Sequence, residues 1–150
     1  MLASNHYFPP FSPEEYQRRY RVLRGAMKEA GLDCLLVYGA ISLAGNDTGQ
    51  INAQYLSNFA GIGHTYVVFP LEEHPTLHIN VPLHAQNARD ISPIQDIRGG
   101  TLIENSVCER LKELGLNKGS VGIVGPGTTY FMPCTLPYEH YTLLLNDFPQ

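Results

Sequence analysis

The sequence contains no tryptophan, only three cysteines and no long hydrophobic run, and each shortage excludes a class of protein. Cys34, Cys108 and Cys134 lie far apart in the chain, and no two of them stand at CxxC spacing. This pattern disfavours a zinc ribbon, a thioredoxin-type redox site and a secreted disulfide framework. A reducing compartment is therefore expected.

Basic charge and membrane signals are also scarce. Ten Lys and Arg stand against fourteen Asp and Glu, which gives a net charge of −4 at pH 7 without a basic cluster for a nucleic-acid partner. No window approaches the roughly 18 apolar residues of a membrane helix. Residues 1–11 lack both the basic and the apolar part of a signal peptide. We expect a cytoplasmic protein that binds neither membrane nor nucleic acid.

What the sequence does contain is enough apolar material for one domain, since 43% of its 150 residues are hydrophobic. A helix over residues 13–30 is predicted by Ser12 as N-cap, Pro13 in the first turn and Gly31 after the last turn. Its apolar face is expected to comprise Tyr16, Tyr20, Leu23, Met27 and Ala30, with Arg18, Arg21 and Arg24 on the solvated face.

The remaining pattern alternates strands with helices. Apolar runs predict strands at 33–39, 65–70, 76–81, 94–97 and 121–125, with the first and last of these buried on both faces. Helices are predicted near 51–59, along the stripe Ile103, Val107, Leu111 and Leu114, and from Pro137 along the stripe Leu136, His140, Leu143 and Leu144. Residues 40–50 are predicted to form an irregular loop at the carboxyl end of the first strand. The fold class is therefore α/β, with a mixed sheet flanked by helices and one antiparallel hairpin.

Three stretches carry a resemblance to a known family: RGAMKEAGLDCLLV at 24–37, NAQYLSNF at 52–59 and VVFP at 67–70. In their order and spacing they resemble the N-terminal domain of the creatinase, prolidase and Xaa-Pro aminopeptidase family. The family's usual form of the second stretch is similar to Asn-x-x-Tyr-Leu-Thr-Gly-Phe, whereas this chain has Ser57 and Asn58 in place of the Thr-Gly pair.

The resemblance implies a three-layer, ribonuclease H-like domain over residues 12–150, preceded by an extension over 1–11. In the family this domain precedes a pita-bread catalytic domain, which is absent from this chain. That catalytic domain holds two divalent metal ions on two aspartates, a histidine and two glutamates, and no such ligand set maps onto this sequence. The resemblance thus implies a non-catalytic domain, inactive alone, whose partners are its own C-terminal catalytic domain and a second copy in a homodimer.

Four residues are candidates for shaping a substrate pocket or a dimer contact: Asn52, Tyr55, Phe59 and His64. The family's dimers bring the small domain of one subunit to the catalytic pocket of the other, which implies that the loop from Ala40 and the segment up to His64 lie near substrate. A purely structural interpretation stays open: Tyr55 and Phe59 as core residues of a short helix, Asn52 supporting the preceding loop, and His64 as a partly exposed loop histidine.

Other activities have weaker support. A nucleotide site at 122–127 would need Gly or Ala at position 130, where Tyr130 stands. His74 and His78, four residues apart on a strand, would be about 13 Å from each other, too far for one metal ion. The middle of the first strand, residues 34–37, lacks the acidic residues of a two-metal nuclease, and no Gly-x-Ser-x-Gly nucleophile elbow occurs. A stand-alone small-ligand or nucleotide-binding module and a pure interaction domain remain the alternatives.

Overall fold

The structure is a computed structural model that describes residues 11–40, 47–125, 127–128 and 133–148. Its α-helices are α1 (Pro13–Ala30), α2 (Ile51–Ser57), α3 (Ala85–Ile91), α4 (Ile103–Glu113) and α5 (Tyr138–Asp147). Its strands are β1 (Cys34–Gly39), β2 (Thr65–Pro70), β3 (Thr76–Ile79), β4 (Asp96–Gly99), β5 (Val121–Val124), β6 (Gly127–Thr128) and β7 (Pro133–Cys134). The described residues also form three short 3-10 helices: η1 (Asp47–Gln50), η2 (Pro82–His84) and η3 (Leu116–Lys118).

Helix α1 begins and ends where the sequence predicts. The Ser12 hydroxyl accepts a hydrogen bond from the Glu15 backbone at 3.4 Å, and Pro13 occupies the first turn. Gly31 adopts φ 67°, in the left-handed region that glycine reaches without strain, and its N–H donates to the Lys28 carbonyl. These two ends confirm the predicted range of 13–30.

The five main strands form one mixed sheet in the order β4-β3-β2-β1-β5. Strands β1 and β2 are antiparallel, as are β2 and β3, so the predicted hairpin between the strands at 65–70 and 76–81 is confirmed. Strands β5 and β4 pair in parallel with β1 and β3 respectively. The carboxyl ends of β1, β3, β4 and β5 therefore meet at one edge of the sheet, called the carboxyl edge below.

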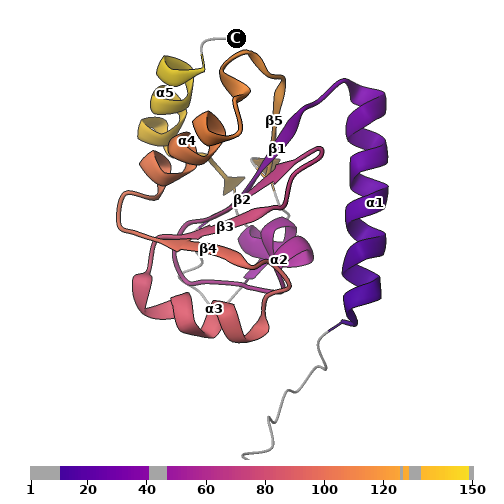
Figure 1. Cartoon of the computed structure of the whole chain (residues 1–150). Helices are drawn as coiled ribbons and strands as arrows, with labels where there is room; N and C mark the ends of the chain where they lie inside the picture. The colour runs from indigo at the N-terminus through magenta and orange to yellow at the C-terminus, as the bar shows by residue number, and fades with distance from the viewer. Residues whose placement is uncertain (1–10, 41–46, 126, 129–132, 149–150) are drawn as a thin grey trace, which may run out of the picture.

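Helices cover both faces of this sheet, which gives three layers (Figure 1). Along β1, Leu35 and Val37 point to a first core cluster, built with α1, α2 and α3. The alternate residues Leu36 and Tyr38 point to a second core cluster, built with α4 and α5. All six residues of β1 are buried, as a strand covered on both faces requires. The predicted three-layer α/β class is confirmed.

The sequence predictions for α3 and for the ends or burial of β3, β4 and β5 were wrong. Helix α3 was missed because it is only seven residues long and its core-facing side, Ala85, Ala88 and Ile91, is mostly alanine, which gives a weak apolar stripe. Strand β4 begins two residues later than predicted, and the predicted strand 76–81 ends at Ile79. Strand β5 is an edge strand whose Ile123 is 41% exposed, not a strand buried on both faces.

The predicted division of α1 into a buried and an exposed face was also partly wrong. Arg18 and Arg21 are exposed as expected, but Arg24 is half-buried and donates to the Glu73 carbonyl at 2.6 Å. Arg19 was assigned to no face and is only 6% exposed, whereas Ala30 is exposed. A helix that packs on both a sheet and a second helix buries a wider arc than its apolar residues alone indicate.

Candidate functional site

Two histidines and two tyrosines meet at the carboxyl edge. The Tyr38 hydroxyl lies 2.7 Å from Nδ1 of His64, and the Tyr66 hydroxyl lies 2.7 Å from Nδ1 of His140. The two imidazole rings stand edge to face with centroids 5.1 Å apart. Nε2 of His140 is 3.4 Å from a carboxylate oxygen of Glu104. We call these five residues the histidine cluster.

The sheet register and two helices assemble this cluster. Tyr38 and Tyr66 are directly opposite each other in the β1–β2 pairing, with ring centroids 4.9 Å apart. His64 precedes β2, while Glu104 comes from the first turn of α4 and His140 from α5. Tyr38 and Tyr66 are 1% exposed, and His64 is half-buried at the rim. Residues from four segments thus converge at the carboxyl end of β1.

Burial sets the charge of the cluster. Loss of hydration lowers the pKa of His64 below its usual value, and the neighbouring His140 lowers it further, while Glu104 acts in the opposite sense. Burial likewise lowers the pKa of His140, again opposed by Glu104. Both imidazoles are therefore neutral at pH 7, and such rings can donate or accept a hydrogen bond to a polar ligand group.

Gln50 holds the backbone that carries His64. Its side chain is 0% exposed, and its amide donates to the carbonyls of Ala40 and Gly63, the latter at 2.8 Å. The Ala40 N–H in turn donates to the Gly49 carbonyl at 3.0 Å. Gln50 thus joins the end of β1 to the residue before His64. Residues 41–46 of the predicted loop at 40–50 lie outside the described residues.

The four sequence candidates are not brought together. Asn52 and Tyr55 are exposed on the outer side of α2, and the Tyr55 ring lies 4.2 Å from the Arg19 guanidinium carbon. Phe59 is 2% exposed in the first core cluster. Only His64 joins the histidine cluster. The sequence placed His140 on a helix stripe but gave no sign that it meets His64, because the β1–β2 register and the docking of α5 create that contact.

The structure also explains why the Ser57-Asn58 pair can replace Thr-Gly. The Ser57 hydroxyl donates to the Ala53 carbonyl at 2.7 Å and accepts from the Phe59 N–H at 3.2 Å, roles that a threonine hydroxyl also fills. Asn58 adopts φ 57°, and asparagine is the residue that most readily replaces glycine there. Its amide donates to the Ile91 carbonyl at 3.0 Å. The local turn is thus compatible with the departure.

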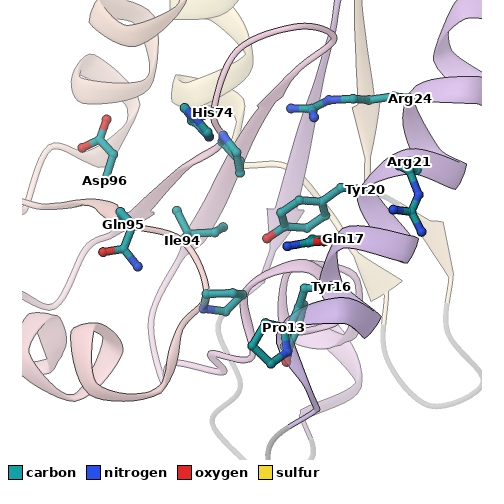
Figure 2. A pocket seen from close by; sticks show the side chains of 12 residues that line it. Pro13, Tyr16, Gln17, Tyr20, Arg21, Arg24, His74, Ile94, Gln95 and Asp96 are labelled. Carbon is teal, nitrogen blue, oxygen red and sulfur yellow. The ribbon is translucent and has the colours of Figure 1, made fainter.

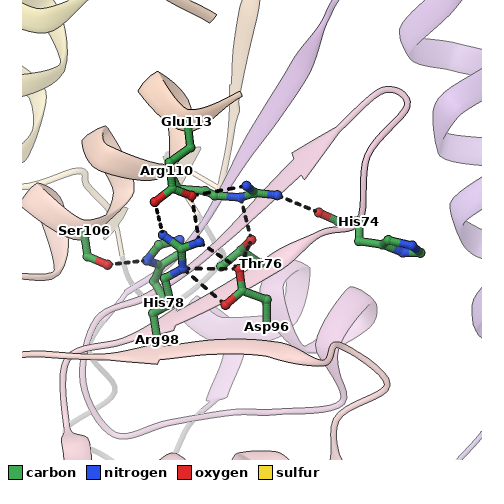
Figure 3. Close-up of polar contacts among 8 residues, drawn as sticks. All are labelled: His74, Thr76, His78, Asp96, Arg98, Ser106, Arg110 and Glu113. Carbon is green, nitrogen blue, oxygen red and sulfur yellow. Dashed lines mark hydrogen bonds and ion pairs between the residues drawn. The ribbon is translucent and has the colours of Figure 1, made fainter. Parts of the chain in front are cut away.

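A second polar network lies where β3 and β4 meet α4 (Figure 3). Arg98 bonds Asp96 at 3.0 Å and Glu113 at 2.8 Å, and Arg110 reaches Glu113 at 3.3 Å. Beneath these pairs, Nδ1 of the fully buried His78 lies 3.0 Å from the Ser106 hydroxyl. The ion pairs are partly exposed and connect strand β4 to helix α4.

We expect His78 to make the protein less stable as the pH falls. Burial, assisted by the nearby Arg98, lowers the pKa of His78 to about 3, against about 6.5 in the unfolded chain. The unfolded chain therefore takes up the proton first, so stability is complete above pH 7 and is lost as the pH falls towards 3. Between pH 7.5 and 5.5 the loss from this group is about 1.4 kcal/mol.

The check is urea denaturation at both pH values for the wild type and for His78→Asn. Asparagine can still reach Ser106 but does not titrate, so the variant should show the smaller decrease between pH 7.5 and 5.5. His64 and His140 keep a residual slope of the same sign in both proteins. An equal decrease in both proteins would mean that His78 is not the group responsible.

The described residues give no support to a metal site, a nucleotide site or a membrane-spanning helix. The described residues contain no group of three or more His, Cys, Asp and Glu that could hold a metal ion. In the described part of the chain β5 is followed by the short strand β6, so Gly125 does not lead into the helix N-terminus that a nucleotide phosphate would use. Tyr130 lies outside the described residues. None of the described helices is long and apolar enough to cross a membrane.

Comparison with known proteins agrees with this fold. The sequence model of the creatinase/prolidase N-terminal domain matches residues 19–149. A comparison with curated protein sequences gives no match. Among solved structures, an Xaa-Pro dipeptidase from Bacillus anthracis aligns with TM-score 0.61 and 21% identity over 89% of this chain. This chain spans only 31% of that protein's length.

Two further structures match along most of their own length. The N-terminal domain of the cytoplasmic peptidase PepQ from Mycobacterium tuberculosis aligns with TM-score 0.62 and 18% identity, covering 87% of this chain and 84% of that one. An Xaa-Pro aminopeptidase structure from Streptococcus pyogenes aligns with TM-score 0.63 and 19% identity, covering 89% and 84%. At these identities the likeness concerns the fold.

Proposed function

Because the chain belongs to the creatinase/prolidase N-terminal domain family, we propose that it is the non-catalytic N-terminal domain of a metal-dependent hydrolase of Xaa-Pro peptides or a related C–N bond. The observation that carries the proposal is the family match over residues 19–149. The similar structures of an Xaa-Pro dipeptidase and an Xaa-Pro aminopeptidase support the peptide substrate class.

The metal-binding side chains of the described residues support separate roles for this domain and the catalytic domain. Since the described residues offer no group of three or more metal-binding side chains, they do not fit the two divalent ions that the family implies. We assign those ions to the catalytic domain. The role left to the histidine cluster is recognition, because neutral imidazoles at a sheet edge can orient a polar substrate group without a metal.

We further propose that the chain acts in a homodimer whose carboxyl edge faces the partner's catalytic pocket. Around α2 and the loop before β2, three large apolar side chains are exposed: Ile51 at 59%, Tyr55 at 50% and Ile62 at 63%. Exposed apolar side chains of this size are often part of a contact surface. His64 lies two residues after Ile62, so a partner that covers Ile62 would also adjoin the histidine cluster.

We place the domain in the cytoplasm. The free thiols of Cys34 and Cys108 are both buried, and burial raises the pKa of each to about 12. Such thiols behave as small apolar groups and suit a reducing compartment. The similar structure from Mycobacterium tuberculosis belongs to a cytoplasmic peptidase, which is consistent with this location.

The test of pocket shaping uses the parent enzyme that the proposal implies. A reading frame that continues beyond Gln150 should encode the ordered Asp, Asp, His, Glu and Glu ligands. In that enzyme, His64→Ala and Asn52→Ala should each raise KM or alter specificity by about fivefold to tenfold, while bound metal stays unchanged. Lys118→Ala, an exposed substitution before β5, is the control. Unchanged kinetics in both variants would contradict the proposed role.

A second candidate, a self-contained ligand-binding module, has one observation in its favour: a groove beside α1, described below. A stop codon directly after Gln150 would favour it over the peptidase domain. If the chain is such a ligand-binding module, added ligand should raise the melting temperature of the isolated chain.

A further inference from the structure

A groove of about 800 Å³ runs along α1, away from the histidine cluster. One wall is α1, and the other is formed by residues 74–75 and 93–96 (Figure 2). Its volume lies within the range of small-ligand pockets, roughly 300–1,000 Å³. Tyr20 and Ile94 provide apolar surface between the two walls, together with Pro13, Pro75 and Pro93.

Two buried polar groups that line this groove lack a partner among the described residues. Nε of Arg24 is buried without a hydrogen bond, although another nitrogen of the same guanidinium donates to the Glu73 carbonyl. Tyr16 is 5% exposed, and its hydroxyl is buried without a partner. Buried polar groups are almost always hydrogen-bonded, so these two groups mark unused hydrogen-bonding positions beside the groove.

The charges along the groove indicate the kind of acceptor. Asp96 is the acidic residue of the lining, and its carboxylate is held by Arg98 at 3.0 Å and by the Thr76 hydroxyl at 3.0 Å. Arg21 and Arg24 form no ion pair among the described residues. Figure 2 shows the Arg24 guanidinium extending from α1 towards His74. That end of the groove is therefore suited to a carboxylate.

The spacing of the two groups indicates the length of the ligand. Tyr16 and Arg24 are eight residues apart on α1, which corresponds to about 12 Å along the helix axis. An extended peptide covers this distance with about four residues. Between the two ends, Gln17 from α1 and Gln95 from the opposite wall provide amides that can pair with peptide groups.

We propose that the groove binds a short extended peptide of about four residues, with its carboxylate at Arg24 and a peptide acceptor at the Tyr16 hydroxyl. This inference does not depend on the proposed function, since it needs no catalytic domain and no second copy. The carboxylate can be a C-terminus or an acidic side chain, and the experiment separates the two.

The test is a titration of the 150-residue chain, followed by amide NMR shifts. The probes are acetyl-tetraalanine with a free carboxylate, the same peptide as its amide, and acetyl-Ala-Ala-Ala-Glu amide. We expect shifts in α1 and at 93–96, and an affinity for the free carboxylate at least about tenfold above that for the amide. Tighter binding of the glutamate peptide would assign the anionic end to a side chain.

Variants connect the binding to the groove. Arg24→Gln should reduce the affinity for the free carboxylate to that for the amide, and Arg24→Lys should restore part of the difference. Arg89→Gln removes the same charge from exposed α3 and should change the affinity by less than about twofold. Equal affinity for all three peptides, an equal loss in Arg89→Gln, or no shift at about 5 mM peptide would each overturn the proposal.

Tyr16→Phe gives a readout that a merely structural role would not produce. Removing a buried hydroxyl without a partner should keep the melting temperature of the free protein unchanged or raise it by about 3 °C. The same variant should bind the free-carboxylate peptide about fivefold more weakly. If Tyr16→Phe lowers the melting temperature and leaves the affinity unchanged, the hydroxyl is structural and its place in the proposal is wrong.

Discussion

Replacing Arg19 with alanine is expected to reduce the free energy of unfolding by about 3 kcal/mol. The guanidinium is almost completely buried, and it donates to the Glu15 carboxylate at 2.9 Å and to the Tyr55 carbonyl at 2.7 Å. Its central carbon lies 4.1 Å from the Phe11 ring and 4.2 Å from the Tyr55 ring. The substitution would remove these contacts and deprive the Tyr55 carbonyl of this donor.

Arg18 offers a matched control on the same helix. It also bonds Glu15, at 2.7 Å, but its side chain is 54% exposed. Exposed ion pairs contribute little, so Arg18→Ala should cost much less than Arg19→Ala. Urea denaturation at pH 7 of both variants measures the difference. Similar values for the two would mean that burial of the Arg19 guanidinium does not stabilise the packing of α1 on α2.

Arg19→Met separates the contribution of the donors from that of packing. Methionine keeps an apolar stem between the aromatic rings but cannot donate to Tyr55 or Glu15. We expect a loss between those of Arg19→Ala and the wild type. Because Arg19 joins α1 to the backbone of α2, we also expect the NMR shifts of Asn52 and Tyr55 to change in both variants.

Replacing Gly125 with alanine is expected to cost about 3 kcal/mol or more. Gly125 has φ 119°, a conformation that side-chain-bearing residues rarely adopt. A Cβ atom there would clash with the backbone oxygen of Tyr38, which cannot move without disturbing β1. Because the Tyr38 side chain contacts His64, the same substitution should shift the amide resonance of His64.

Gly25 is the control, since it also lacks a side chain but lies in the middle of α1 with nothing within 4 Å of a built Cβ. Gly25→Ala should stabilise the protein by about 0.5–1 kcal/mol, because alanine favours the helix. The two glycine substitutions should therefore change the unfolding free energy in opposite directions. A Gly125→Ala variant as stable as the wild type would contradict the close approach to Tyr38.

Those parts of the fold that depend on local chemistry could be predicted from the sequence. Ser12 and Gly31 define α1, and the apolar run after Asp33 indicates β1, because capping and burial patterns act within a few residues. Helix α3 could not be predicted, since it is short and its core-facing side consists of two alanines and Ile91. The exposure of β5 depends on its place at the sheet edge, which is a property of the topology.

The candidate site was predictable only in part for the same reason. His64 could be proposed from its position before a strand, and Asn52 from the family resemblance. The partners of His64 could not, because Tyr38 and His140 are far from it in sequence and meet it through strand register and the docking of α5. Arg19 was missed because an arginine in an amphipathic helix is normally expected on the solvated side.

The two core clusters impose an order on folding during synthesis. The buried residues of the first cluster lie between Met27 and Ile97, so that layer is complete in sequence when about two thirds of the chain has been made. The second cluster also needs Leu111 from α4 and packs against Leu144 from α5. Until those helices emerge from the ribosome, Leu36 and Val68 on the other face of the sheet have no cover. A nascent chain that pauses between α3 and α4 would therefore expose this apolar face of the sheet, and exposed apolar surface of this kind is prone to aggregation.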